Sequence, residues 1–420
     1  MAIAIIGGGA AGLMAAITAA RACKDAEDAP PIVVFEPNEQ LGRKLRITGK
    51  GRCNVTNDCD RDEFLANIPT NPRFLYSALA DFSTKDTQDF FEELGVPLKV
   101  ERGKRVFPVS DRAADVAEAM AKECHRLGVT FVRSRVSEII VRDGNVSGVR
   151  AGTRVYPAVS VIVCTGGCSY AITGSDGNGY RLVEPLGHTI VPPVASLVPI
   201  VCEGTLCAQL MGLSLRNVQL QVVRRADQKK IFEDFGEMLF THYGMTGPLV
   251  LSASAHMADL DEGKYDIRID LKPALDEATL DRRVVSDFQT YANRDFINAL
   301  NDLLPQKAIE PVAKLSGIDL HKKVHTITKE ERQQLVRLLK CLPFQPLRFR
   351  PINEAIITKG GVSVKEIKPK TMESKLVAGL YFAGEIIDVD GYTGGFNLQI
   401  AFSTAVAAAN AAASASMWCG

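Results

Sequence analysis

The sequence lacks an uninterrupted apolar run of the roughly 20 residues that a membrane-spanning helix requires. Its first 20 residues are mostly apolar, but they have no basic start, and glycines break the continuity that a secretion signal needs. The apolar segment after Phe396 is interrupted by polar residues, among them Asn397 and Gln399. These absences predict a soluble protein without a membrane partner.

Excess charge and paired cysteine motifs are also missing. Lys+Arg and Asp+Glu each number 49, and this zero net charge argues against an obligate nucleic-acid binder, although a local basic patch stays possible. The ten cysteines are dispersed without a C-x-x-C motif, which excludes a small disulfide scaffold and favours a reducing cytoplasm. No spacing of His, Cys and Asp indicates a metal site.

What the chain does contain is concentrated first at its N-terminus. An apolar run precedes three glycines with the spacing G-x-G-x-x-G, and a helical run, a second apolar run and Glu36 follow. Strand, turn, helix, strand and acid are the context that a dinucleotide-binding fingerprint requires. Gly7 would permit the turn, Gly9 the approach of backbone to a pyrophosphate, and Gly12 close packing of helix on strand. The phosphates would lie at the helix N-terminus, and Glu36 would accept hydrogen bonds from ribose hydroxyls.

A long basic loop, residues 37–57, directly follows this acid. It is rich in glycine, Lys and Arg, and loops of this length in compact domains are usually functional. We expect its cations and backbone to wrap an anionic cofactor; the alternative is a solvated surface loop.

Two further glycine turns lie far along the chain. Thr165, Gly166 and Gly167 follow a buried strand, and the segment 383–397 leads from a strand through acids and glycines into a long Ala-rich helix. In a doubly wound sheet this tail must return beside the first strand, at the crevice where ligands bind. One long ligand would explain all three turns, and FAD has that length. The alternative is that the later two are ordinary strand-end turns.

Several local signals predict where helices and strands begin. Ser83 with Asp86, and Thr328 with Glu331, have the spacing of capping boxes. Asp111 is expected to cap a helix that runs to about Leu127. We also predict a strand at 249–254 and a helix at 295–304.

Six segments, which together span nearly the whole chain, carry a resemblance to a known family. They are IIGGGAAGLMAA, GRKLRITGKGRCNVTN, VIVCTGG with SYAITGSDGNGY, MLFTHYGMTGP, PINEAIITKGGVSVKEI, and TMESKLVAGLYFAGEIIDVDGYTGGFNLQIAFSTA. The sequence resembles the BaiN-type (YhiN-like) NAD(P)/FAD-dependent oxidoreductases of the glutathione-reductase-like flavoprotein superfamily.

The resemblance implies an α/β fold with a Rossmann-like FAD-binding domain built from both chain ends. A β-rich, barrel-like domain and a small helical domain would be inserted into it. The expected boundaries are 1–191 and 350–420 for the FAD domain, 192–273 and 334–349 for the β-rich domain, and 274–333 for the helical domain.

The resemblance also implies a set of cofactor-binding residues, with Val136 contacting the adenine through its backbone. The set is Gly7, Gly9, Ala11, Gly12, Glu36, Lys44, Arg52, Cys53, Val136, Thr165, Gly166, Gly167, Gly384, Glu385, Gly395, Phe396, Asn397 and Leu398.

The expected activity is hydride transfer from NAD(P)H to tightly bound FAD, and then to a small organic acceptor such as an enone-type C=C bond. No second G-x-G-x-x-G follows a strand, so NAD(P)H is expected to bind only transiently. His242 is the first candidate for the proton donor and Tyr243 the second, because a histidine can titrate near neutral pH. The alternative for His242 is a buried structural role.

Three rival functions stay open from the sequence. A flavin disulfide reductase would use Cys53 and Cys59, although their C-x5-C spacing differs from the C-x4-C that is typical of such pairs. Cys202 and Cys207 have that spacing elsewhere in the chain. An RNA-modifying flavoprotein would use the basic run 43–52 and the Lys-rich stretch 359–375. A non-catalytic FAD sensor would need neither redox cysteines nor a basic surface. The sequence leaves both a monomer and a homodimer open.

Overall fold

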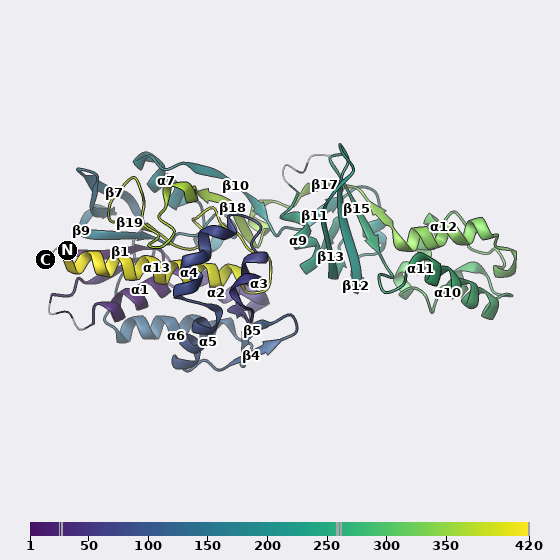
Figure 1. The fold of residues 1–420 in the computed structure, drawn as a ribbon, viewed down its shortest axis with the longest axis horizontal. Helices are drawn as coiled ribbons and strands as arrows, with labels where there is room; N and C mark the ends of the chain where they lie inside the picture. Colours follow the sequence, from purple (N-terminus) through teal and green to yellow (C-terminus); the bar gives the residue numbers. More distant parts are fainter. Residues whose placement is uncertain (25, 27, 258–259, 261–262, 419–420) are drawn as a thin grey trace. The chain divides into compact units, whose positions relative to one another are not determined.

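The computed structural model describes residues 1–24, 26, 28–257, 260 and 263–418 of the 420-residue chain. The chain divides into two compact units (Figure 1). The first unit consists of Met1–Ser196 and Ile352–Gly420, and the second of Leu197–Pro351. Both chain ends therefore build the first unit.

A seven-stranded sheet forms the centre of the first unit, in the order β6-β2-β1-β9-β8-β7 with β19 beside β9. The strands are β1 (Ala2–Ile6), β2 (Ile32–Phe35), β6 (Thr130–Val132), β7 (Val136–Arg142), β8 (Asn145–Ala151), β9 (Arg154–Val163) and β19 (Leu380–Phe382). Strands β6, β2, β1, β9 and β19 pair in parallel, whereas β7, β8 and β9 form an antiparallel meander. The parallel pairing brings the carboxyl ends of β1, β9 and β19 to one edge of the sheet.

Helices α1 (Ala10–Ala22), α6 (Ala113–Arg126) and α13 (Phe396–Trp418) share the hydrophobic core of this unit with the sheet. Figure 1 shows α13, in yellow, running alongside α1. Helix α13 has 23 residues, and its segment Phe396–Met417 is long and apolar enough to cross a membrane. However, 67% of its most apolar window is buried inside the protein, so packing in the core accounts for its apolar surface.

Short elements complete the first unit. They are α2 (Arg43–Ile47), β3 (Thr56–Asn57), α3 (Arg61–Ala66), α4 (Tyr76–Asp81), α5 (Thr84–Glu93), β4 (Leu98–Glu101), β5 (Arg105–Pro108), α7 (Asn178–Val183), β10 (Ile190–Ser196) and β18 (Ile357–Val362). Strands β3, β5 and β4 form a small antiparallel sheet, and β10 pairs with β18.

The second unit contains an antiparallel sheet in the order β16-β15-β12-β13-β14-β11-β17 and several helices. Its strands are β11 (Ile200–Cys202), β12 (Ser214–Arg224), β13 (Lys229–Phe240), β14 (Gly244–Thr246), β15 (Tyr265–Asp270), β16 (Leu342–Phe344) and β17 (Pro346–Phe349). Its α-helices are α8 (Leu206–Gln209), α9 (Pro248–Ser254), α10 (Glu277–Thr290), α11 (Gln306–Leu315) and α12 (Lys329–Lys340). Sheet and helices share one hydrophobic core, and a finer division into a β-rich and a helical domain stays a prediction.

The structure confirms both capping boxes, Ser83 with Asp86 and Thr328 with Glu331. The strand predicted at 249–254 is wrong, because this apolar run forms helix α9, which begins with a proline as helices often do.

Two further local predictions are also wrong. Asp111 does not cap α6, because its carboxylate binds Arg52 and Lys99 instead. Only Phe296–Ala299 of the predicted helix at 295–304 is helical, as a 3-10 turn.

Candidate functional site

A cavity of about 1330 Å3, counting the part that is open to solvent, lies in the first unit. Its walls come from the turns after β1, β9 and β19, from the end of β2, and from the start of α13. Twelve residues of the predicted cofactor set line it: Gly7, Gly9, Ala11, Glu36, Lys44, Val136, Thr165, Gly166, Gly384, Glu385, Asn397 and Leu398. Segments that are far apart in the sequence thus meet at the carboxyl edge of the sheet, as expected for a doubly wound fold.

The turn between β1 and α1 makes a cradle of bare backbone. Gly7 has a φ of 108°, and a Cβ on Gly12 would lie 1.8 Å from the Gly7 carbonyl oxygen, so neither position accepts a side chain. A Cβ on Gly9 would meet nothing within 4 Å. Helix α1 begins there without a side-chain cap and without an acid in its first turn. Its free N–H groups and its dipole suit a pyrophosphate.

Glu36, at the end of β2, is held rigidly at the cavity wall. Its Oε2 accepts the Gly8 backbone N–H at 2.8 Å, and its Oε1 accepts both the backbone and the side-chain N–H of Asn38, at 2.8 and 2.7 Å. Arg43 in turn donates to Asn38 Oδ1 at 2.7 Å. The carboxylate also lines the cavity, where a ribose hydroxyl could donate a further hydrogen bond to one of its oxygens.

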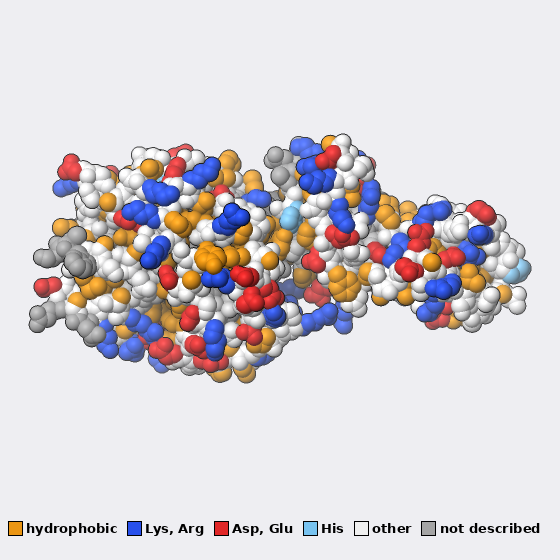
Figure 2. All heavy atoms as spheres, viewed as in Figure 1, with side chains coloured by type: hydrophobic (Ala, Val, Ile, Leu, Met, Phe, Trp, Pro, Cys, Tyr) orange, Lys and Arg blue, Asp and Glu red, His pale blue; other side chains and the backbone are white. Residues whose placement is uncertain are grey.

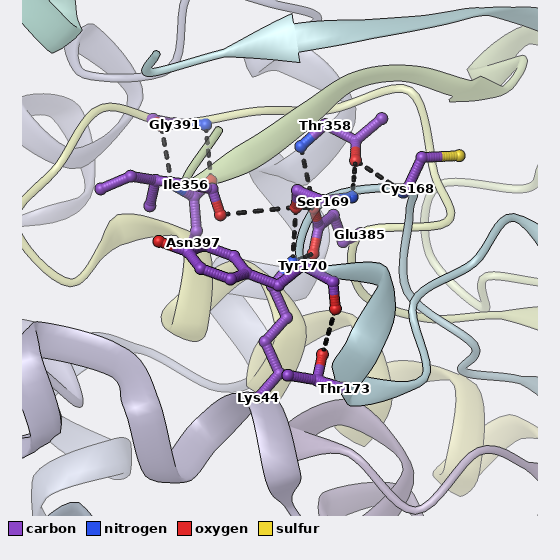
Figure 3. Close-up of polar contacts among 10 residues, drawn as sticks. All are labelled: Lys44, Cys168, Ser169, Tyr170, Thr173, Ile356, Thr358, Glu385, Gly391 and Asn397. Atoms are coloured by element: carbon purple, nitrogen blue, oxygen red, sulfur yellow. Dashed lines mark hydrogen bonds and ion pairs between the residues drawn. The ribbon is translucent and has the colours of Figure 1, made fainter. Parts of the chain in front are cut away.

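An ion pair joins the two chain ends across the cavity wall (Figure 3). Lys44 Nζ, on α2, lies 2.6 Å from Glu385 Oε2 and 2.7 Å from Ser169 Oγ. Glu385 Oε1 also accepts the Ser169 hydroxyl at 2.9 Å and the Thr358 backbone N–H at 2.8 Å. Both charged side chains are mostly buried, so the network fixes the position of a cation and an acid beside the cavity.

The start of α13 is fixed by its own side chain. Asn397 Oδ1 accepts the Gly391 N–H at 2.8 Å, and its Nδ2 donates to the Gly391 carbonyl at 2.7 Å (Figure 3). Behind it, a Cβ on Gly395 would lie 2.3 Å from the Thr56 carbonyl, so only glycine fits that close approach. A second helix N-terminus therefore faces the cavity through Asn397 and Leu398.

These features fit a long dinucleotide such as FAD. Besides the cradle and the acid, Thr165 Oγ1 is buried at the cavity without a described hydrogen-bond partner. A buried hydroxyl without a partner is costly, and it is the kind of atom that a bound ligand or water satisfies.

Six predicted cofactor residues do not line the cavity, and four of them lie within two positions of residues that do. These four are Gly12, Gly167, Gly395 and Phe396. Arg52 is engaged elsewhere, since it binds Asp111 at 2.6 Å and Glu101, and it stacks on Phe107 at 4.2 Å.

Cys53, the sixth of these residues, is completely buried, and burial raises the pKa of its thiol to about 12. Burial also raises the pKa of the Cys59 thiol, to about 11. A redox pair needs an accessible thiolate of low pKa. These thiols therefore do not suit a disulfide reductase.

His242 and Tyr243 lie in the second unit, in the turn between β13 and β14. Their rings are 4.9 Å apart, and the Arg350 guanidinium lies 4.7 Å from the Tyr243 ring. All residues that line the cavity belong to the first unit, so the described cavity does not include the proton-donor candidates.

Sequence reasoning did not name four polar residues of the cavity, Asn38, Arg135, Asp176 and Asn178, whereas Arg43 belongs to the basic loop that was expected to wrap the cofactor. Asp176 accepts from Arg135 at 2.6 Å and from the Asn178 backbone N–H at 3.1 Å. The signals in the sequence were the polar segment SYAITGSDGNGY for Asp176 and Asn178, and the loop 37–57 for Asn38; no motif marked Arg135. The described residues hold no group of three or more His, Cys, Asp or Glu side chains that could bind a metal ion.

The fold has counterparts among solved structures. The chain matches the FrdA chain of Escherichia coli quinol fumarate reductase with a TM-score of 0.51 at 16% identity, over 100% of this chain and 71% of that one. It matches 3-ketosteroid delta1-dehydrogenase from Sterolibacterium denitrificans with a TM-score of 0.50 at 12% identity, over 98% and 99%. At such identities the likeness shows the fold alone.

Relatives and a family model go further. The chain is 32% identical to the 3-dehydro-bile acid delta(4,6)-reductase of Clostridium scindens over 98% of both chains. It is also 32% identical to the ribosomal RNA dihydrouridine synthase of Haemophilus influenzae over 96% of both chains. The family model described as HI0933-like protein Rossmann domain matches residues 1–411.

Fold, cavity and relatives together define a Rossmann-like, FAD-dependent oxidoreductase. The chain belongs to the HI0933-like family, which confirms the resemblance to BaiN-type oxidoreductases.

Proposed function

We propose that the protein reduces a C=C bond conjugated with a carbonyl group in a small organic acceptor, with NAD(P)H as the transient electron donor. The observation that supports this proposal most is what the names of two relatives have in common. The names of the bile acid reductase and of the RNA dihydrouridine synthase both describe saturation of a C=C bond, in a steroid or in uracil. The cavity suits FAD, and the identity of the acceptor is what the two names leave to be decided.

FAD, when bound, would carry the hydride between donor and acceptor. The residues of the chain would hold it: the N-terminus of α1 the pyrophosphate, and Glu36 the ribose. Lys44, held in place by Glu385 and Ser169, would present its remaining N–H donor at the wall. Because saturating the bond consumes one hydride and one proton, we assign the proton to His242, or to Tyr243, in the second unit.

A small acceptor fits the charge of the protein better than RNA does. Figure 2 shows Lys and Arg side chains interspersed with Asp and Glu on the face that is drawn, without one broad basic surface. Many of the cations form ion pairs, such as Arg225 with Asp266 and Lys104 with Glu63. An RNA-binding surface needs unpaired cations along a groove or face. We place the protein in the cytoplasm, as a monomer or homodimer.

The test uses the visible spectrum of the purified protein reconstituted with FAD. NADH or NADPH, added without oxygen, should bleach the flavin band, and the preferred donor should bleach it faster. A steroid 4,6-dien-3-one should then restore the oxidised spectrum, and His242→Asn should slow that second step while it leaves the bleaching unchanged. A flavin that neither nucleotide reduces would contradict the proposed donor.

RNA is the second candidate, because two relatives are named ribosomal RNA dihydrouridine synthases, at 32% and 30% identity. An unmodified ribosomal RNA transcript should be offered to the reduced protein in parallel with the steroid. Reoxidation by RNA alone, with the mass of one uridine rising by two hydrogen atoms, would replace the small acceptor by RNA.

A further inference from the structure

The second unit contains an apolar pocket that the flavin chemistry does not use. Its volume is about 540 Å3, counting the part that is open to solvent. Leu210, Leu215, Phe240, Val312 and Leu342 form part of its wall, and all five also belong to the core of the unit. Strands from the sheet and helix α11 both line it, so the pocket lies where the two kinds of element meet.

Two cations stand at this apolar wall without a carboxylate. Lys272 is half-buried and Arg216 is exposed, and neither side chain has a hydrogen bond or an ion pair with any residue that the structure describes. Burial lowers the pKa of the Lys272 ammonium; Arg283 acts in the same direction and Asp287 against it. A partly desolvated ammonium without a counter-ion is unfavourable, and an anion placed beside it would relieve that cost.

The acids around Lys272 already have partners. Asp270, two residues before it, binds Lys340 Nζ at 2.5 Å and accepts the Lys272 backbone N–H at 2.8 Å. Asp287 binds Arg283 at 2.9 Å. The neighbouring carboxylates are therefore neutralised by other cations, and the Lys272 ammonium can pair with a ligand.

A third positive feature borders the same pocket. Helix α11 begins at Gln306 without a side-chain cap and without an acid in its first turn. Leu304, Pro305 and Ala308 at this start line the pocket. The dipole at a helix N-terminus adds to the attraction that Lys272 exerts on an anion.

We propose that this pocket binds an amphipathic carboxylate, whose apolar body occupies the wall of leucines while its carboxylate pairs with Lys272 and Arg216. The apolar part gains from removal from water, and the charged end gains a charge-assisted hydrogen bond. A straight-chain fatty acid and a steroid acid both have this chemistry. The site is separate from the residues of the flavin cavity and does not depend on the proposed reaction.

The test measures binding to the full-length, FAD-loaded protein by titration calorimetry, with decanoate, cholate and the neutral analogue decanol. Decanoate or cholate should bind, and Lys272→Met should weaken that binding by about tenfold or more, the effect of losing one charge-assisted hydrogen bond. Decanol should bind wild type and Lys272→Met alike. Binding by decanoate alone would identify a flexible chain as the ligand body, and binding by cholate alone a rigid ring system.

Matched variants separate this role from a structural one. Lys272→Met removes a desolvated charge, so its thermal midpoint should stay equal to wild type or rise, while Lys272→Arg should keep the affinity. Lys314→Ala removes a cation from the same helix, α11, which pairs with Glu310 and does not line the pocket, and it should leave binding unchanged. Failure of both acids to bind at millimolar concentration, or equal binding to Lys272→Met, would overturn the proposal.

Discussion

Helices α1 and α12 begin in opposite ways. Helix α12 has a complete capping box, in which Thr328 and Glu331 satisfy each other's backbone N–H groups, and two acids in its first turn. Helix α1 has Gly9 at its cap, no side-chain bond and no acid. The start of α12 is exposed to solvent and its own side chains satisfy its N–H groups, whereas the start of α1 lines a cavity and leaves its N–H groups to a ligand. A helix start that lacks its own partners is thus informative when it faces a cavity.

The largest loss of stability should come from adding a side chain at Gly12, in the first turn of α1. In Gly12→Ala, the new methyl group would lie 1.8 Å from the Gly7 carbonyl oxygen, which is backbone and cannot move away cheaply. We expect the free energy of unfolding of the apoprotein to fall by about 3 kcal/mol or more, measured by urea denaturation. A variant as stable as wild type would show that the turn is looser than this packing implies.

The next largest loss of stability should come from a change near the C-terminus of α1. There, side chains of the protein are bound by other side chains, whereas the N-terminus of α1 is left to a ligand. Glu123 on α6 binds Arg126 at 2.7 Å and Arg21 of α1 at 2.8 Å, and these guanidinium groups lower the pKa of its carboxyl to about 2. Glu123→Gln should lower the free energy of unfolding by about 2 to 3 kcal/mol at pH 7.

The pH dependence of this cost follows from the sign of the shift. Since the folded pKa lies below the unfolded one, the stabilisation is present above about pH 4.5 and is lost as the pH falls toward 2. The difference between wild type and variant should therefore shrink over that range, as thermal unfolding can show. Glu118→Gln, which removes an exposed acid of the same helix, should change stability by only about 0.5 kcal/mol. A constant difference from pH 7 to pH 2 would contradict the assignment.

A smaller effect is expected at the self-sufficient start of α12. Thr328→Ala removes the hydroxyl that accepts the Glu331 N–H, and it should lower the free energy of unfolding by about 1 kcal/mol. Thr328→Ser keeps that hydroxyl and serves as the control. Neither variant should change FAD affinity, which fluorescence titration can measure; a loss of FAD would mean that this helix contributes to the site.

The smallest change in stability should come from Gly9→Ala, together with a large change in binding. A Cβ there meets no protein atom within 4 Å, and φ is −82°, so the apoprotein should change by no more than about 0.5 kcal/mol. FAD affinity should fall by about tenfold or more, because the methyl group enters the space where backbone would approach the pyrophosphate. Unchanged FAD affinity would remove α1 from the site.

The sequence by itself determined the local chemistry of the first unit. The G-x-G-x-x-G spacing, the acid after the second strand and both capping boxes depend on residues only a few positions apart, so they can be read along the chain. The return of the tail to the crevice was also predictable, since a parallel sheet brings strand ends to one edge, but β19 pairs with β9 and not, as predicted, with the first strand.

Only the tertiary structure decided where long side chains and ambiguous apolar runs go. Lys44 reaches Glu385 from the other end of the chain, whereas Arg52, eight residues after it, pairs with Asp111 away from the cavity. Residues 249–254 form a helix rather than a strand, because a short apolar run suits either and the packing around it makes the choice. Nothing within a local window encodes such partners, because pairing and burial depend on segments that meet only after the chain has folded.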